Sequence, residues 1–327
     1  MRKIIVLLTA LFFLQGCKNE MVPQENSPQS TMEETLPNET MESDQNDNPL
    51  ISWEEKEVVI KELQNDYEVW FLSDLHMVSA GDDDSLQVKE YALERSEVFN
   101  LQQKEDPQEI LAQFIILANE NQPDLIVFGG DIIDFPSKSN LSCLKENLQK
   151  LKVPYLFVMG NHDWTYPWEY MTQEGSHEYR PKVENITGVD SYAGMLEWED
   201  IVFLAIDNSS NQVAAQAANK IEEAYATQKP IVLIQHVPFS TEKLIARAKN
   251  DWSNPVTLGM QVHGGIPVNE VSGKLYQNVL QDESQIRLIL AGHVHFSYEE
   301  MISQNTKEII GDAAFKGRAV KINISRE

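Results

Sequence analysis

Histidine, aspartate and asparagine residues recur in four short motifs, and each motif directly follows a run of apolar residues. The motifs are Ser73–His76, Gly129–Asp134, Gly160–Asp163 and Gly292–His295. A further histidine, His236, follows the apolar residues 231–234 in the same manner. Asp, Asn and His offer the oxygen and nitrogen atoms that bind divalent ions such as Mn, Fe and Zn. The pattern therefore indicates a metal site built without cysteine.

The apolar runs before the motifs predict strands, because they are short and bounded by turn residues. These strands cover residues 68–72, 125–128, 155–159, 231–235 and 286–290. Patterns of helical spacing lie between them, over residues 86–99, 139–151 and 214–227, and from residue 107 to an end marked by Pro123. Alternating strands and helices favour an α/β fold, and open α/β sheets place their ligand sites at the carboxyl ends of strands. We therefore expect the motifs to converge on one site in a single domain, residues 51–327.

The number of candidate ligands exceeds what one tetrahedral site needs and fits two ions that share a bridging carboxylate. The candidates are Asp74, His76, Asp131, Asn161, His236, His293 and His295. Glycines before Asp131, Asn161 and His293 permit the tight turns and the close backbone approach that such loops need. Two ions about 3.5–4 Å apart can clamp a phosphoryl group and generate a hydroxide nucleophile near neutral pH.

The ordered set of motifs, D-x-H, G-D-x-x-D, G-N-H-D, H and G-H-x-H, resembles the calcineurin-like metallophosphoesterases over about residues 66–298. The resemblance implies an α/β fold in which two mixed sheets form a sandwich flanked by helices, a four-layer αββα arrangement. It also implies two divalent metal ions (Mn, Fe or Zn) held by two ligand sets with one bridging residue. The sets are Asp74, His76 and His295 for one ion, Asn161, His236 and His293 for the other, and Asp131 as the bridge.

The same resemblance implies that His162 protonates the leaving oxygen, that Asp163 orients His162, and that Asp134 is structural. Alternative interpretations remain for single residues: Asp74 and Asp131 can be turn residues at strand ends, and a lone His236 can be a packed core residue. Their places in the ordered set favour metal binding. His177 and His263 lie outside the motifs, and we expect both on the surface or in loops.

Residues 1–16 are expected to be a lipoprotein signal peptide. Arg2 and Lys3 precede an apolar run over residues 4–14, which is too short to span a bilayer. The run ends in Leu14-Gln15-Gly16-Cys17, which resembles a bacterial lipobox, although Gln15 departs from the small or aliphatic residue usual there. The expected outcome is export, lipid attachment to Cys17 and anchoring outside the cell membrane. The alternative is a secretory peptide cleaved elsewhere.

Residues 17–50 are acidic and almost devoid of large apolar side chains, so we expect a disordered tether. The net charge of −25 leaves −20 on residues 51–327. Proteins that bind nucleic acids usually present a basic face, so this charge disfavours nucleic acid as a partner. Cys143 has no cysteine partner besides Cys17 and is expected to be a buried apolar side chain.

The sequence thus predicts a metal-dependent phosphoesterase that hydrolyses phosphomonoesters or phosphodiesters by attack of a metal-bridging hydroxide. The alternative is a surface lipoprotein that has lost catalysis and uses the same fold for binding. Nucleotides, cyclic nucleotides, phospholipid headgroups and cell-wall phosphodiesters remain open as substrates, and membrane anchoring favours lipid or envelope compounds. We expect loops 79–106, 164–190 and 250–270 to select the substrate. The motifs determine neither substrate nor oligomeric state.

Overall fold

The computed structural model describes residues 50–99, 106–165, 171–252 and 268–327. These residues fall within the unit Asn48–Glu327. The expected signal peptide, almost all of the expected tether, Cys17 and His263 lie outside the described residues. None of the helices in the described part of the chain is long and apolar enough to cross a membrane.

One sheet joins the first part of the chain to its end. Its strands are β1 (Ser52–Val59), β2 (Tyr67–Leu72), β3 (Leu125–Phe128), β4 (Tyr155–Phe157) and β11 (Arg318–Ser325). Their order is β1-β11-β2-β3-β4. Strands β2, β3 and β4 run parallel, so their carboxyl ends lie along one edge.

The second sheet contains the later strands. They are β5 (Ala193–Glu197), β6 (Val202–Ile206), β7 (Ile231–Ile234), β8 (Ile286–Ala291), β9 (Tyr298–Met301) and β10 (Lys307–Ile310). Their order is β5-β6-β7-β8-β10-β9. The four central strands are parallel, and the edge strands β5 and β9 are antiparallel to their neighbours.

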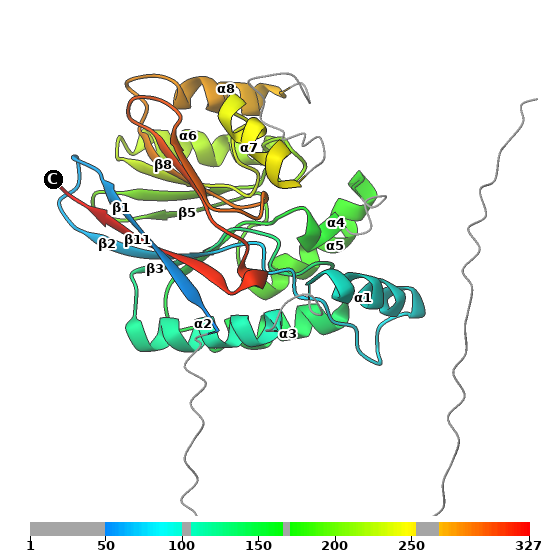
Figure 1. The fold of residues 1–327 in the computed structure, drawn as a ribbon. Coiled ribbons are helices and arrows are strands. Elements are labelled where there is room, and N and C mark those ends of the chain that lie inside the picture. The colour runs from blue at the N-terminus through cyan, green and yellow to red at the C-terminus, as the bar shows by residue number, and fades with distance from the viewer. Residues whose placement is uncertain (1–49, 100–105, 166–170, 253–267) are drawn as a thin grey trace, which may run out of the picture. The chain divides into compact units, whose positions relative to one another are not determined.

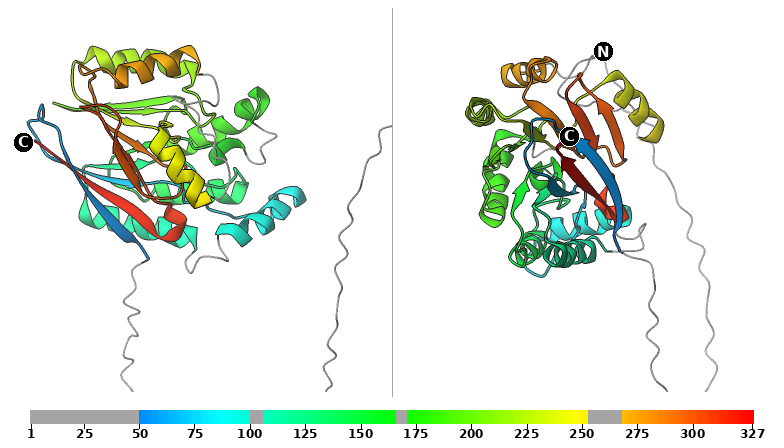
Figure 2. Two further views of the ribbon diagram at one scale, coloured as in Figure 1. Left: turned by 45° about the horizontal axis from the view of Figure 1, so that its top comes forward. Right: turned by 90° about the vertical axis from the view of Figure 1, so that its left-hand side faces the viewer.

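Helices cover the outer face of each sheet (Figures 1 and 2). The helices are α1 (Leu86–Phe99), α2 (Pro107–Asn121), α3 (Lys138–Leu148), α4 (His162–Thr165), α5 (Gln173–Thr187), α6 (Ala218–Ala226), α7 (Glu242–Trp252) and α8 (Glu270–Val279), with short 3-10 turns η2 (Ala215–Ala217) and η3 (Ala314–Lys316). Helices α2 and α3 lie on the side of the first sheet, whereas α6 and α8 lie on the side of the second (Figure 1). This arrangement confirms the predicted two-sheet α/β sandwich.

The alternation of side chains along the strands builds the layers, because successive residues of a strand point to opposite faces. In β2, Val69 and Phe71 pack into the core between the sheets, whereas Trp70 and Leu72 pack toward the helices. In β6, Phe203 likewise joins the core between the sheets. Burial on both faces explains why these strands are continuous apolar runs.

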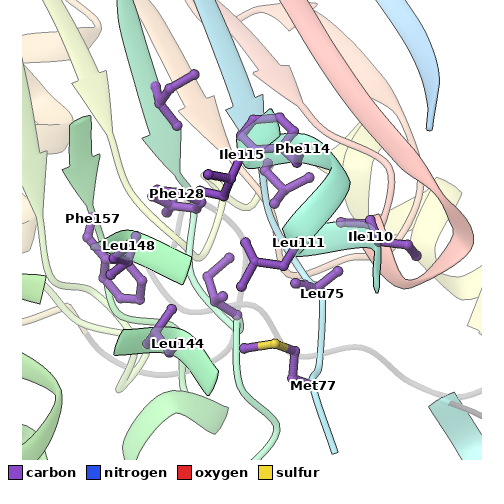
Figure 3. Packing of buried hydrophobic residues seen from close by; sticks show 14 of the residues in the cluster. Leu75, Met77, Ile110, Leu111, Phe114, Ile115, Phe128, Leu144, Leu148 and Phe157 are labelled. Carbon is purple, nitrogen blue, oxygen red and sulfur yellow. The ribbon is translucent and has the colours of Figure 1, made fainter. Parts of the chain in front are cut away.

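Helix α2 shows how the local sequence produces an element of the outer layer. Asp106 caps its start by accepting the N–H of Gln108, and Pro107 occupies the first turn, where it interrupts no helical hydrogen bond. The apolar face, including Leu111 and Phe114, packs beneath the first sheet (Figure 3). The predicted helix start is therefore confirmed.

Three of the longer helices were not predicted from the sequence. Helix α5 lies within the segment 164–190, which we expected to be a loop, and it contains Gly175 and Pro181. Both residues lower helix propensity, so the pattern looks irregular. Helices α7 and α8 were also missed, although their few buried side chains, such as Leu244 and Ala248, follow helical spacing. Cys143 is half-buried rather than fully buried, with its sulfur 3.9 Å from that of Met77.

Candidate metal centre and active site

Within each sheet, the loops after neighbouring strands are joined by backbone hydrogen bonds, and the loops of the two sheets bring candidate ligands within 4.8 Å of one another. Asp74 donates its N–H to Gly130 O at 2.9 Å, and His76 donates to Asp131 O at 2.9 Å. Across the second sheet, Gly292 donates to His236 O at 3.0 Å. The motifs therefore converge at the carboxyl ends of the strands, as the strand pattern predicted.

Most of the expected ligands have a left-handed backbone conformation, which L-residues other than glycine adopt rarely. The φ angles are 55° at Asp74, 49° at His76, 52° at Asp131, 72° at His293 and 58° at His295. Such conformations persist where the surrounding structure enforces them, and they cluster at functional sites.

Two glycines permit the close approach of these loops. A Cβ atom at Gly160 would lie 2.1 Å from Asp131 Oδ1, and one at Gly292 would lie 2.4 Å from Asp74 Oδ2. Both contacts are far below van der Waals distance, so no larger residue fits without moving a carboxylate. The expected role of these glycines is confirmed.

The structure brings six of the expected ligands into two groups. Asp74, His76 and His295 form one group, and Asp131, His236 and His293 form the other, with ligand atoms within 4.8 Å of one another in each. Asp131 Oδ2 lies 3.2 Å from His236 Nε2 and 3.7 Å from His76 Nε2. This one carboxylate oxygen therefore faces both groups.

The donor atoms of the two groups fit divalent ions. His76 Nε2 lies 3.1 Å from His295 Nε2, and His236 Nε2 lies 3.3 Å from His293 Nδ1. Burial lowers the pKa of His76 to about 4 and that of His293 to about 3, so both rings are neutral at pH 7 and retain a lone pair. Neutral imidazole is the form that binds metals.

Asn161, the seventh expected ligand, supplies a further sign of a metal. Its side chain is only 7% exposed, and its Oδ1 has no hydrogen-bond partner among the described residues. A buried carbonyl oxygen without a partner is costly unless it binds a water or an ion. The donor set of carboxylate, amide and imidazole groups without sulfur suits Mn, Fe or Zn.

His236 is fully buried, as a packed core histidine would be. However, its Nδ1 lies 2.9 Å from Gly129 O, which directs Nε2 toward Asp131. Asn208, which sequence reasoning missed, fixes this loop by accepting the N–H groups of His236 and Val237 at 3.1 and 2.9 Å. The position of Asn208, two residues after the apolar run 201–206, was the only sequence signal for it.

His162 lies beside the carboxylate of Asp134, at 3.0 Å from Nδ1 to Oδ1. Burial alone lowers the pKa of His162, but the charges of Asp134 and Asp131 outweigh it and raise the pKa above its usual value. This shift favours the protonated ring, which is the form that a general acid requires.

Asp163 has different contacts from those expected of it. Its carboxylate accepts the N–H groups of Gly160, Asp131, Ile132 and Ile133 at 2.8–3.1 Å. It thus shapes the loop that carries Asp131. The carboxylate that contacts the His162 ring is therefore that of Asp134, which lies 3.0 Å from Nδ1.

Helix α1 contributes two residues that the sequence did not identify. Arg95 donates from Nε and Nη2 to the carboxylate of Asp134 at 2.6 and 2.9 Å. Phe99 stacks on the ring of His76, with centroids 4.3 Å apart and an interplanar angle of 3°. Neither residue belongs to a motif, and only the predicted helix over 86–99 pointed to this segment. His177 is exposed on α5, as expected.

Comparisons with known proteins agree with the fold and the motifs. Residues 67–297 match the family model for calcineurin-like phosphoesterases. One component of the nuclease SbcCD from Staphylococcus epidermidis is 29% identical over 175 residues, 47% of this chain and 45% of that protein. The corresponding protein of Staphylococcus saprophyticus is 23% identical over 213 residues, 59% of this chain and 52% of that protein. The chain thus spans about half the length of these curated relatives.

Among solved structures, a dimetal phosphatase from Danio rerio is 11% identical with a TM-score of 0.42, covering 76% of this chain and 88% of that one. A 5'-nucleotidase from Candida albicans is 12% identical with a TM-score of 0.39, covering 79% of this chain and 47% of that one. The family model extends over most of the chain and includes every motif described above up to His295. The chain belongs to the calcineurin-like phosphoesterase family.

Proposed function

We propose that this chain hydrolyses phosphomonoesters or phosphodiesters with two divalent metal ions. The observation that carries the proposal is Asp131, whose Oδ2 faces both histidine–carboxylate groups. Membership of the phosphoesterase family supports the reaction class. The buried histidine–carboxylate groups support metal dependence.

We assign the ligands by group. Asp74, His76 and His295 would hold one ion, Asn161, His236 and His293 would hold the other, and Asp131 would contact both. When bound, such a pair of ions neutralises charge on the phosphoryl group and activates water.

The residues around the ions perform the remaining chemistry. Water gives up one proton to solvent, its oxygen forms a bond to phosphorus while the ester P–O bond breaks, and the leaving oxygen takes a proton from His162. Because Nδ1 of His162 faces Asp134, we assign the transfer to Nε2. The charge of Asp134 raises the pKa of His162 and so favours the protonated ring.

Nucleic acid is a second substrate class to be tested, because the curated relatives are components of a nuclease. The net charge of −20 on residues 51–327 speaks against it, since phosphate backbones favour basic surfaces. We therefore favour small phosphate esters, with lipid or envelope compounds first among them.

We further propose that residues 1–16 are a signal peptide, that Cys17 carries lipid, and that residues 17–50 tether the phosphoesterase domain, residues 51–327, outside the cell membrane. The charged start, the short apolar run and Gly16-Cys17 support this proposal. This location makes lipid headgroups and cell-wall phosphodiesters accessible.

The test is hydrolysis by the full-length protein in detergent with Mn²⁺, Fe²⁺ or Zn²⁺. Substrates are bis-p-nitrophenyl phosphate, p-nitrophenyl phosphate, a phospholipid panel, nucleotides and single- and double-stranded DNA. The Asp131→Asn variant is the control for contaminating activity. Metal-dependent hydrolysis by the wild type that Asp131→Asn lacks would support the proposal. Bound metal without hydrolysis of any ester would favour the alternative, a binding protein that has lost catalysis.

A further inference from the structure

Helix α1 approaches the catalytic residues with one face. Val88, Ala92, Arg95 and Phe99 follow helical spacing and lie on this face. Val88 and Ala92 pack against a small apolar cluster that also contains Phe99. Leu86 and Leu93, by contrast, are 79% and 71% exposed. The helix therefore contacts the domain through a narrow strip that ends at the site.

Arg95 forms a bidentate ion pair with Asp134. Nε lies 2.6 Å from Oδ2 and Nη2 lies 2.9 Å from Oδ1, and Asp134 is fully buried. A planar guanidinium that binds both carboxylate oxygens fixes the orientation of the carboxylate as well as its charge. Lysine has a single charged nitrogen and cannot fix this plane.

The carboxylate that Arg95 holds contacts two imidazoles of different assigned roles. Asp134 Oδ1 lies 2.9 Å from His76 Nδ1 and 3.0 Å from His162 Nδ1. In each ring the contacted nitrogen is Nδ1, so Nε2 is turned away from Asp134, and in His76 it lies 3.1 Å from His295 Nε2. One oxygen atom thus sets the direction of a metal ligand and of the proton donor.

We propose that Arg95 is a positioning residue that aims His162 for proton transfer and His76 for metal binding by holding Asp134 in place. The inference rests on the proposed function and deepens it, because it adds a residue from α1 to the same site. Phe99 supports the arrangement by stacking on His76, and the Arg95 guanidinium lies 5.0 Å from the centre of the Phe99 ring.

A purely structural role for Arg95 makes different predictions. If Arg95 only compensates the buried charge of Asp134, its loss lowers the free energy of unfolding and affects all substrates alike. If Arg95 positions the two imidazoles, its loss lowers kcat most for esters whose leaving group needs a proton. It also weakens one of the two metal sites, because residues that orient a metal ligand typically change metal affinity about 10- to 100-fold.

The test uses Arg95→Ala and Arg95→Lys in the full-length protein, with Lys89→Ala as the matched control. Lys89 is a cation on the same helix that contacts Asp82 O at 3.3 Å and not Asp134. For Arg95→Ala we expect kcat on an alkyl phosphate ester to fall about 10- to 100-fold and kcat on the p-nitrophenyl ester to fall much less. Arg95→Lys should recover only part of the kcat that Arg95→Ala loses on the alkyl ester. Lys89→Ala should have the kcat of the wild type on both esters.

Metal affinity gives a second readout that does not depend on activity. In a titration against a chelator, Arg95→Ala should weaken one of two metal equivalents about 10-fold and leave the other unchanged. The inference would be overturned if Arg95→Ala lowered kcat equally on both ester types and kept its affinity for both metal equivalents. Unchanged kcat values in Arg95→Ala would overturn it as well. Circular dichroism checks folding, and Arg95→Lys decides the matter if Arg95→Ala does not fold. A wild-type protein that hydrolyses no ester contradicts the proposed function instead, and the metal titration then decides on Arg95 alone.

Discussion

The carboxylate of Asp74 accepts the backbone N–H of His293 at 2.9 Å, although the two residues stand 219 positions apart in the chain. Asp74 follows the first sheet's β2, and His293 follows the second sheet's β8. A candidate ligand of one metal group thus fixes the backbone of a candidate ligand of the other. The two groups are therefore not independent, and changes at one are expected to reach the other.

Asp131→Asn should weaken both metal sites, because a neutral amide replaces the charge that faces both groups. After mild dialysis, the wild type should retain up to two metal equivalents per chain and Asp131→Asn should retain fewer. Elemental analysis measures both. Glu55→Gln, an exposed change in β1, serves as the control. Full retention of both equivalents in Asp131→Asn would contradict the assignment of Asp131 as the shared residue.

His162→Ala should lower kcat on an alkyl phosphate ester by about 10²–10⁴-fold, the usual contribution of a general acid. The loss should be smaller on p-nitrophenyl esters, because their leaving group needs little protonation. Metal content should be nearly unchanged, since Asn161 and not His162 is the assigned ligand. Equal activity on the alkyl ester would remove His162 from the mechanism, whereas loss of metal would make it a ligand.

Glu308→Gln should stabilise the protein at alkaline pH. Glu308 is fully buried in β10, and burial raises its pKa from 4.5 to about 8 even though Phe239 N–H contacts it at 3.0 Å. Between these pH values the unfolded chain has lost this proton and the folded chain has kept it. The carboxyl group therefore costs stability increasingly as pH rises from about 4.5 to 8.

The measurement for Glu308→Gln is the free energy of unfolding in urea at pH 5 and pH 8. The variant should gain little at pH 5 and on the order of a few kcal/mol at pH 8. Glu55→Gln, whose side chain is exposed, should give the same small change at both pH values. A gain that does not grow with pH would show that Glu308 is not the group responsible.

Cys17→Ser should release the protein from the membrane fraction and leave its phosphoesterase activity intact, if the lipid is the anchor. Fractionation after a high-salt wash checks the prediction, with the unaltered protein as the reference. A Cys17→Ser protein that remains membrane-bound would show that something other than lipid on Cys17 holds it there.

The strands that carry the site were predictable, because burial on both faces makes them continuous apolar runs that end in polar turns. Leu125–Phe128 is an example: all its side chains are buried, and its predicted bounds are those observed. The bounds of α1 were also predicted correctly. By contrast, α7 and α8 were not predicted, although Leu244 and Ala248 in α7 and Leu275 and Val279 in α8 are buried at helical spacing.

The side-chain contacts of Asp134 and Asp163 could not be predicted from the sequence. Asp163 is the neighbour of His162 in sequence, yet its carboxylate accepts backbone N–H groups of the Gly129–Asp134 loop. Spacing along a tight turn does not determine where a side chain points. Arg95 was equally hidden, because one arginine in an amphipathic helix carries no local signal and its partner stands 39 positions later.

Five of the assigned metal ligands adopt a left-handed backbone, which lowers the stability of the fold at positions that serve activity. They are Asp74, His76, Asp131, His293 and His295. Each such conformation costs an L-residue about 1–2 kcal/mol that glycine does not incur. The same positions hold the side chains assigned to the metals, so local backbone preference favours glycine where catalysis requires aspartate or histidine. Selection for stability in the absence of metal would be expected to replace these residues first and to yield a more robust, inert fold.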